Sequence, residues 1–185
     1  MIAATHSTLP ALRPPTAGVV FTTYNRPRDL ERVLAGYARQ TRPDFEIVIA
    51  DDGSGPETRE CIARARDTWQ LNIRHVWHED IGFRKCRILN RAIIESPAEY
   101  LIFTDGDCIP HPEFVAGHLG LARPGFFVSG GCVRLGQPAT DAIVPDDVLA
   151  GRVFDTEWLR ARGESSMNLR KMLFSMEPRG FTLPA

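Results

Sequence analysis

Residues 18–121 alternate between short apolar runs and longer amphipathic stretches, and this alternation constrains the fold more than any other feature. The short runs are rich in β-branched and aromatic residues, although the third also contains polar ones, and they are Gly18–Thr22, Phe45–Ala50, Asn72–Trp77 and Tyr100–Thr104. The stretch after the first run places Leu30, Val33 and Leu34 at helical spacing, which is typical of a helix with one buried face. Strand–helix units in this order predict parallel strands joined by right-handed helical crossovers. We therefore expect an α/β fold whose helices cover both faces of a mostly parallel sheet.

Size and composition favour one domain without a strongly charged surface. The chain has 185 residues, of which 43% are hydrophobic, enough for one core but short for two domains. Its formal net charge of −1 gives no reason to expect nucleic acid as a partner. We divide the chain into a proline-rich leader (residues 1–16), a core (17–135) and a partial or covering helical segment (136–185), and the short length also fits a truncated protein.

The cysteines and the N-terminus predict a cytoplasmic protein. The four cysteines are far apart and form no CxxC pair or Cys/His cluster, so neither a zinc site nor a disulfide framework is expected. The first residues lack the basic start and apolar core of a signal peptide, and no run of about 18 apolar residues occurs. We expect a reducing cytoplasmic location, with peripheral contact at the inner face of a membrane as a further hypothesis.

Unusual polar residues follow the expected strands, at their carboxyl ends. These ends read TTYNR, DDGSG, HEDIG and DGDC along the sequence. The carboxyl ends of parallel strands meet at one edge of the sheet, and ligands bind there. The sequence therefore predicts a binding site at that edge.

Two aspartates follow the fourth expected strand directly. Asp105 and Asp107 flank Gly106, and a glycine lets the backbone approach a ligand closely. Paired carboxylates suit a hard divalent cation, Mg2+ or Mn2+, which also takes phosphate oxygens and waters as ligands. A solvated Asp-Gly turn is the alternative for this motif taken alone.

A second acidic pair, Asp51 and Asp52, follows the second expected strand. Two acidic strand ends on one edge repel each other unless a cation or hydrogen-bond donors lie between them. The alternative is a turn into a helix, because Ser54 and Glu57 have the spacing of a capping box and Pro56 suits the first helical turn. That alternative explains Ser54 but accounts less easily for Asp52.

Aromatic and basic side chains complete the candidate site. Tyr24, next to the hydroxyls of Thr22 and Thr23, offers a face on which a base could stack, and ordinary packing is the alternative. The third expected helix begins with a polar group of residues, Arg84, Lys85, Arg87 and Asn90. Cations at a helix N-terminus favour phosphate, and a solvated basic face is the alternative.

Three segments together carry a resemblance to a known family. They are the segment from Val19 to Ser54, GFRKCRILNRAI from Gly82 to Ile93, and EYLIFTDGDCIPHPEF from Glu99 to Phe114. In order and spacing they resemble the nucleotide-sugar-binding half of a family 2 glycosyltransferase with the Rossmann-like GT-A fold, over residues 18–131. In this resemblance the acidic pair of the third segment matches the family's DxD motif.

The resemblance implies contacts with the nucleoside of a donor. Thr22, Tyr24 and Asp52 would contact the nucleoside, and Asp52 would accept a hydrogen bond from the base. Asp51 would support the loop that carries Asp52. The donor expected from the resemblance is a nucleotide-diphosphate sugar, with a UDP-sugar as the first choice.

The resemblance also implies a metal and a diphosphate site. Asp107 would bind the Mn2+ or Mg2+ ion that bridges the diphosphate. Asp105 would contact the ribose or the sugar and belong to the same metal site. Arg87 would approach the diphosphate, with Lys85 as a weaker candidate.

The reaction implied is transfer of a sugar to an acceptor hydroxyl with inversion, in the synthesis of bacterial-type cell-surface polysaccharide or glycoconjugate. The acceptor would be a glycan or a lipid-linked molecule. A cation and an arginine would stabilise the charge that develops on the leaving nucleoside diphosphate. Inversion also needs a general base at the acceptor, and no motif for one follows residue 131. The acids available there are Asp141, Asp146, Asp147, Asp155, Glu157 and Glu164. We take Asp146, Asp147 and Asp155 as candidates.

Two other functions compete with this one. The missing base motif favours a nucleotide-diphosphate-binding module that has no turnover. The run YLIFTDGDCI also resembles the nucleophile strand of haloacid-dehalogenase-type phosphatases, with Asp105 as nucleophile and Asp107 as acid/base. That family needs the motif on its first core strand, and here three strand–helix units precede it.

The C-terminal residues and the histidines complete the set of expectations. Two helical pieces are expected, Asp155–Arg162 and Ser165–Phe174, and they fit a helix that covers the sheet or, alternatively, an amphipathic helix at a membrane surface. The histidines at positions 75, 78, 111 and 118 have no spacing typical of a metal site. We expect them to be exposed or satisfied by hydrogen bonds.

Overall fold

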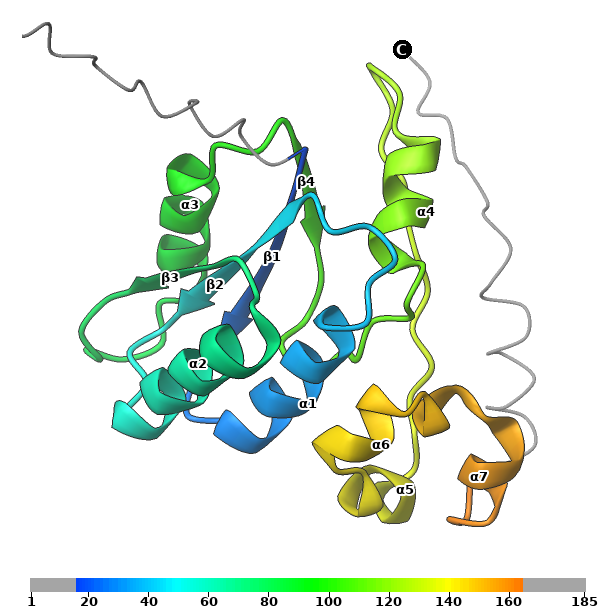
Figure 1. Ribbon diagram of the computed structural model, residues 1–185. Coiled ribbons are helices and arrows are strands. Elements are labelled where there is room, and N and C mark those ends of the chain that lie inside the picture. The colour runs from blue at the N-terminus through cyan, green and yellow to red at the C-terminus, as the bar shows by residue number, and fades with distance from the viewer. Residues whose placement is uncertain (1–15, 165–185) are drawn as a thin grey trace, which may run out of the picture.

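The computed structural model describes residues 16–164, and its centre is a four-stranded parallel sheet. The strands are β1 (Ala17–Thr23), β2 (Phe45–Asp51), β3 (Ile73–Trp77) and β4 (Tyr100–Phe103). They lie in the order β3-β2-β1-β4, so β1 has a neighbour on each side (Figure 1). In this register Val20 of β1 pairs with Val48 of β2 and with Phe103 of β4. All four predicted strands are confirmed.

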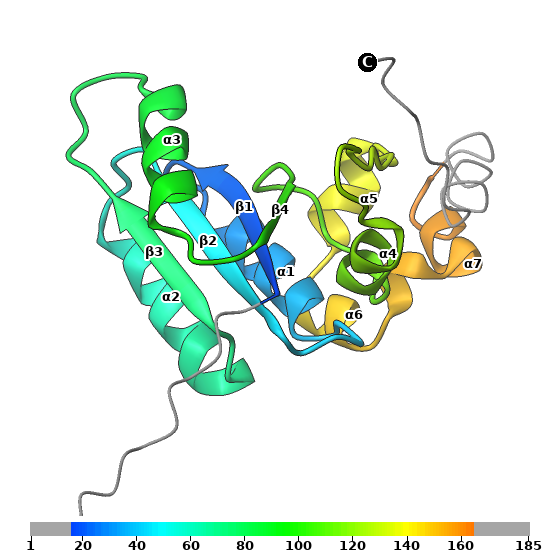
Figure 2. The same ribbon diagram turned by 90° about the horizontal axis from the view of Figure 1, so that it is seen from above.

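Helices cover both faces of the sheet, as the sequence predicts (Figure 2). The longer helices are α1 (Pro27–Tyr37), α2 (Pro56–Trp69), α3 (Lys85–Glu95) and α4 (Phe114–Leu121). Shorter pieces follow, and they are α5 (Gln137–Ala142), α6 (Pro145–Leu149), the 3-10 turn η1 (Arg152–Phe154) and α7 (Thr156–Arg160). The α/β fold class expected from the alternation is therefore confirmed.

The core has two layers because successive residues of a strand point to opposite faces. On one face Phe21 and Ile47 pack with residues of α1, α2 and α4, among them Leu30. On the other face Val20 and Val48 pack with Ile88 and Ala92 of α3. Because β1 and β2 are buried on both sides, they fix the position of the loops that follow them.

The start of α2 differs from the expected capping box. Gly55 is the residue that precedes the helix, and no side chain caps it. Ser54 Oγ instead accepts a hydrogen bond from the backbone N–H of Asn25, at 2.9 Å. The capping-box prediction is wrong because Ser54 joins two loops, whereas Pro56 does begin the helix as predicted.

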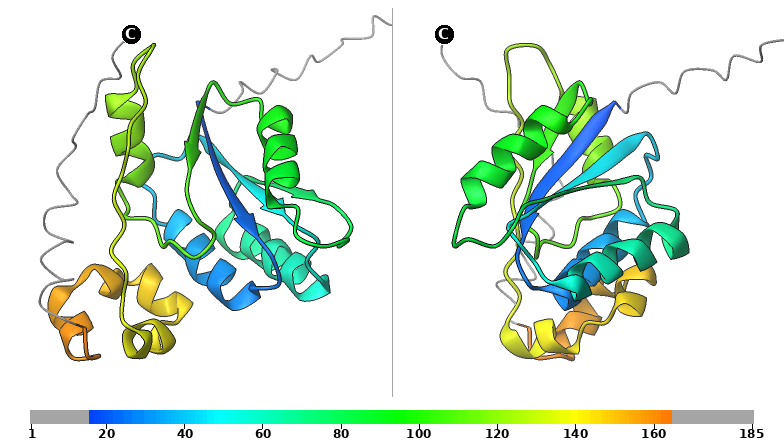
Figure 3. Two further views of the ribbon diagram at one scale, coloured as in Figure 1. Left: turned by 180° about the vertical axis from the view of Figure 1, so that it is seen from behind. Right: turned by 90° about the vertical axis from the view of Figure 1, so that its left-hand side faces the viewer.

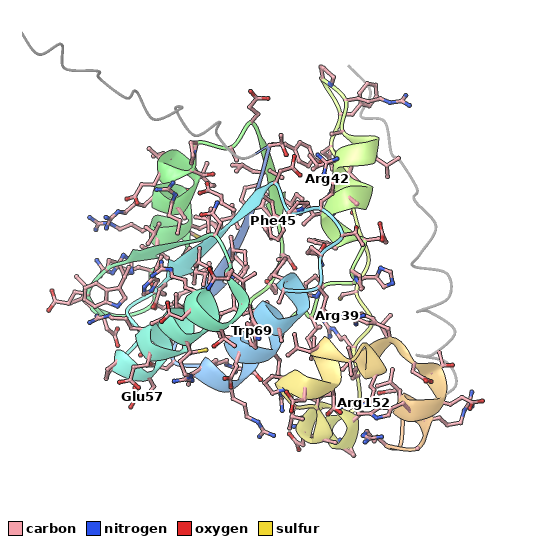
Figure 4. The ribbon with its side chains drawn as sticks, in the orientation of Figure 1. Arg39, Arg42, Phe45, Glu57, Trp69 and Arg152 are labelled. Atoms are coloured by element: carbon pink, nitrogen blue, oxygen red, sulfur yellow. The ribbon has the colours of Figure 1, made fainter. Side chains whose placement is uncertain are left out.

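The short C-terminal helices pack on α1. Val148 of α6 and Val153 of η1 lie in a buried cluster with Ala35 of α1, and Arg39, at the α1–α6 junction in Figure 4, donates to the carbonyl of Val148 at 3.2 Å. A long segment without helix or strand, residues 122–136, leads from α4 to this cluster (Figure 3). The helix predicted over 155–162 is confirmed as α7, and the helix predicted over 165–174 lies outside the described residues.

Candidate functional site

The strand order brings three polar loops together. Since β1 lies between β2 and β4, the loops after these three strands meet at one edge of the sheet. A cavity of about 300 Å3 opens there, and its lining residues are Thr22, Thr23, Tyr24, Arg26, Asp52, Phe83, Lys85, Gly106 and Asp107. Side chains predicted from separate motifs of the sequence therefore share one cavity, which we call the edge cavity.

A second hollow of about 290 Å3 adjoins the edge cavity. It is lined by Val20, Phe21, Thr22, Lys85, Leu89, Phe103, Thr104 and Asp105. Thr22 and Lys85 line both spaces, so they form a common wall. The second hollow is more apolar, because four of its eight lining residues are valine, leucine or phenylalanine.

Asp51 is held inside the protein. It is buried, one oxygen contacts Nε2 of His75 at 2.8 Å, and the other accepts the backbone N–H of Ser54 at 2.8 Å. Burial acts against the charge of this carboxylate, but the hydrogen bonds from His75 and Ser54 outweigh it and lower its pKa. Asp51 thus organises the loop after β2, and it does not line the edge cavity.

Asp52 reaches the edge cavity although it is only 5% exposed. Its Oδ1 lies 2.7 Å from Nε2 of His78, and its Oδ2 accepts the backbone N–H of Arg84 at 3.0 Å. Both oxygens therefore have protein partners, which fix the carboxylate in place. Histidines and backbone N–H groups are thus the partners of the Asp51–Asp52 pair after β2.

Tyr24 offers its ring to solvent while its hydroxyl is fixed. The residue is 49% exposed and lines the edge cavity. Its hydroxyl donates to Oδ2 of Asp80 at 2.8 Å, and this hydrogen bond raises the pKa of Tyr24 and lowers that of Asp80. Gly53 adopts a φ of +99°, and a Cβ there would lie 2.6 Å from Cα of Asp80. A glycine at this position therefore lets the loop after β2 approach the loop after β3, which carries Asp80.

The Asp105–Asp107 pair is exposed at the end of β4. Ligand atoms of Asp105, Asp107 and Cys108 all lie within 4.8 Å of one another. A Cβ on Gly106 would collide with the carbonyl oxygen of Thr22, so the glycine allows the close packing against β1. The exposed carboxylates suit a divalent cation that also takes oxygen ligands from a phosphate.

The two basic candidates of α3 occupy different positions. Lys85 Nζ lies 3.8 Å from Oδ1 of Asp105, and Lys85 lines both cavities. Arg87 is exposed and lines neither of them. In this conformation Lys85 is therefore the basic residue that lies closer to the aspartate pair.

The acids considered as a general base lie in the C-terminal helices. Asp147 accepts the backbone N–H of Val144 at 3.0 Å and pairs with Arg152 Nε at 2.7 Å. Burial acts against its charge, but these two partners lower its pKa. Asp155 accepts the N–H groups of the first turn of α7, and Asp146 is exposed in α6. None of the three lines either cavity.

Sequence reasoning missed the partners of the aspartates. The sequence predicts that the histidines are exposed or satisfied by hydrogen bonds, and His75 and His78 are hydrogen-bonded, but the sequence does not predict that they hold the acidic pair. The sequence also does not predict that Asp80 accepts the hydroxyl of Tyr24. For His118 the prediction is wrong, because its Nδ1 is buried and no partner for it exists within residues 16–164; burial lowers the pKa of this ring.

A comparison with known families decides the classification. Residues 18–176 match the family model of glycosyl transferase family 2. The chain belongs to this family. Within the part of the chain that the structure covers, no helix is long and apolar enough to cross a membrane.

Relatives of this family 2 chain are named transferases and polymer synthases. Validoxylamine A glucosyltransferase of Streptomyces hygroscopicus subsp. jinggangensis is 35% identical over 159 residues, which cover 79% of this chain and 37% of that protein. Chondroitin synthase of Escherichia coli is 32% identical over 104 residues, which cover 56% of this chain and 15% of that protein. The chain thus spans less than half the length of either relative.

Solved structures confirm the GT-A fold. A mannosyltransferase of Pyrobaculum calidifontis, solved in complex with GDP-Man and Mn2+, is similar with a TM-score of 0.56 and 26% identity, over 66% of this chain and 37% of that one. TarS of S. aureus is similar with a TM-score of 0.52 and 24% identity, over 57% of this chain and 31% of that one. The fold implied by the resemblance of the sequence is therefore confirmed.

Proposed function

We propose that the chain binds a nucleotide-diphosphate sugar and a divalent cation at the edge cavity, as the donor-binding part of an inverting glycosyltransferase. The observation that carries this proposal is the convergence of Tyr24, Asp52 and Asp107 on one cavity from three separate loops. It offers an aromatic face, a fixed acceptor and a metal ligand within one site. Residues 17–135 would form the donor-binding core.

The nucleoside would lie on the Tyr24 and Asp52 side of the edge cavity. The exposed ring of Tyr24 can stack on a planar base. Asp52, which is fixed by His78 and the N–H of Arg84, can accept a further hydrogen bond, because each carboxylate oxygen has more than one lone pair. Thr22 would contribute from the common wall, and Asp51 would support the loop. A UDP-sugar is our first choice of donor.

The diphosphate and the cation would lie on the Asp107 side. Asp105 and Asp107 fit a divalent cation through exposed oxygen ligands in close proximity, and Mn2+ or Mg2+ is the ion that we propose. A bound cation would supply positive charge where the leaving nucleoside diphosphate becomes negative. The position of Lys85 beside Asp105 supports Lys85 as a phosphate ligand, with Arg87 as a second contact if its side chain turns.

Transfer would run to an acceptor hydroxyl of a glycan or a lipid-linked molecule, in cell-surface polysaccharide or glycoconjugate synthesis at the inner face of a membrane. A carboxylate at the acceptor would take the hydroxyl proton during attack on the anomeric carbon. Asp146 would be the candidate, because the side chains of Asp147 and Asp155 hold helix ends. Its place outside both cavities also favours the second candidate function, a module that binds the donor without turnover.

Thermal unfolding with nucleotides tests donor binding. We would measure the melting temperature with UDP, GDP, ADP and CDP, each with and without Mn2+, because a ligand that binds the folded state raises it. A rise that needs Mn2+ and disappears in Asp107→Asn supports the proposal. Glu99→Gln, which changes an exposed acid at the opposite end of β4, is the control. An unchanged Mn2+-dependent rise in Asp107→Asn would contradict it.

Turnover is tested separately with intact sugar nucleotides. Release of nucleoside diphosphate from a UDP-sugar, measured with and without added glycan acceptors, distinguishes the two candidate functions. A transferase releases it in an acceptor-dependent manner, and Asp146→Asn slows this release. Donor binding without any release favours the binding module.

A further inference from the structure

Phe83 is the most exposed large apolar side chain at the edge cavity. It is 87% exposed, and it lines the cavity together with Tyr24, Asp52 and Asp107. Removal of such an apolar ring from water by a bound ligand is favourable. Ile81, in the same loop, is 66% exposed and lines neither cavity. The position of Phe83 therefore differs from ordinary surface exposure in this loop.

The loop that carries Phe83 is held on both sides. The backbone N–H of the next residue, Arg84, donates to Asp52 at 3.0 Å. Asp80 accepts the hydroxyl of Tyr24 at 2.8 Å and the N–H of Gly82 at 3.2 Å. The backbone at Phe83 is thus fixed relative to the two residues that we assign to the nucleoside. The point from which the ring extends is therefore set before any ligand arrives, so that binding has to order only the side-chain torsions of Phe83.

We propose that Phe83 is a second aromatic contact for the nucleoside of the donor, in addition to Tyr24. This inference rests on the proposed function and deepens it, because it adds a residue from the loop before α3 to the nucleoside site. Phe83 would cover the nucleoside after it enters, and its exposed area would be removed from water in the complex. Its contribution would be to affinity, with no part in proton transfer.

The chemical properties of a phenyl ring favour the nucleoside, and not the diphosphate, as the partner of Phe83. A phenyl ring has no hydrogen-bond donor and no charge, so it offers little to a diphosphate, whose oxygens need cations and N–H groups. Base rings have π-faces that stack on aromatic side chains irrespective of their identity. The residues that suit a diphosphate in the same cavity are the cations Arg26 and Lys85 and, through the cation that we propose, Asp107.

Calorimetry with nucleotides and with pyrophosphate tests this assignment. The full chain is titrated in the presence of Mn2+ with UDP and GDP, and separately with inorganic pyrophosphate, which lacks a nucleoside. We expect Phe83→Ala to bind the nucleotide about tenfold more weakly than wild type, as for the loss of one stacking contact. Pyrophosphate affinity should stay unchanged, and Phe83→Trp should keep the nucleotide affinity.

Two exposed isoleucines provide matched controls. Ile81→Ala alters the same loop, and Ile94→Ala removes an 82% exposed side chain on α3; both should bind nucleotide as wild type does. Equal nucleotide affinity of Phe83→Ala and Ile81→Ala would overturn the inference while donor binding stands. Equal weakening of nucleotide and pyrophosphate by Phe83→Ala would also overturn it, since the effect would then be structural. If wild type binds no nucleotide, the proposed function fails, and the inference fails with it.

Discussion

Removal of His78 tests how the edge cavity is held in shape. His78 Nε2 lies 2.7 Å from Oδ1 of Asp52, a carboxylate that is only 5% exposed. In His78→Ala that oxygen loses its partner, while the other keeps the N–H of Arg84. A hydrogen bond to a charged group contributes about 1.5–3 kcal/mol to stability. We therefore expect the free energy of unfolding to fall by about 2 kcal/mol.

Urea unfolding measures this loss, and the melting temperature should fall by about 4–8 °C. The double variant His78→Ala/Asp52→Asn tells whether the loss comes from this pair, because it should cost less than the sum of the two single changes. His78→Gln, which keeps an N–H donor, should recover part of the stability. A loss below about 0.5 kcal/mol in His78→Ala, or additive effects in the cycle, would refute the reasoning.

Three further changes probe neighbouring features. Gly106→Ala forces a Cβ against the carbonyl oxygen of Thr22 in β1, so it should lower the melting temperature and abolish Mn2+-dependent nucleotide binding in the thermal assay. Gly120→Ala, where a Cβ meets open space, is the control and should change neither. Tyr24→Phe keeps the ring but loses the hydrogen bond to Asp80, so calorimetry should show a smaller loss of nucleotide affinity than Tyr24→Ala. The pKa of Asp51 is lowered in the folded protein. The stability that its charge contributes is therefore present above its unfolded pKa of about 4 and is lost as the pH falls through the folded pKa. The difference in urea stability between wild type and Asp51→Asn should shrink from pH 7 to pH 3.

The framework of the fold was accessible from the sequence because it depends on local pattern. Buried strands contain continuous apolar runs, such as Ile47–Ala50 within β2, and the helices between them show one apolar face. The capping box at Ser54 failed for a different reason. The spacing of Ser54 and Glu57 fits the motif, but the hydroxyl oxygen of Ser54 accepts a hydrogen bond from the backbone N–H of Asn25, which lies 29 positions away. Such a long-range partner leaves no trace in a local motif.

The candidate site shows the same limit. The positions of Asp52, Asp105 and Asp107 follow from the ends of the strands, and the structure brings two of them to one cavity. The partners that hold them were not predictable, because His75 and His78 look like isolated histidines in the sequence. Their spacing from Asp51 and Asp52 acquires meaning only once β3 lies beside β2.

The 3.8 Å pair between Lys85 and Asp105 would couple the binding of the cation to that of the diphosphate, the two binding events that we propose for this site. A cation that approaches Asp105 competes with the ammonium group for the same carboxylate oxygen. Once the cation holds that oxygen, Lys85 is released at the wall that both cavities share, and its charge becomes available to an anion in either of them. The metal and the phosphate should therefore strengthen each other's binding, and by thermodynamic reciprocity each should do so by the same factor.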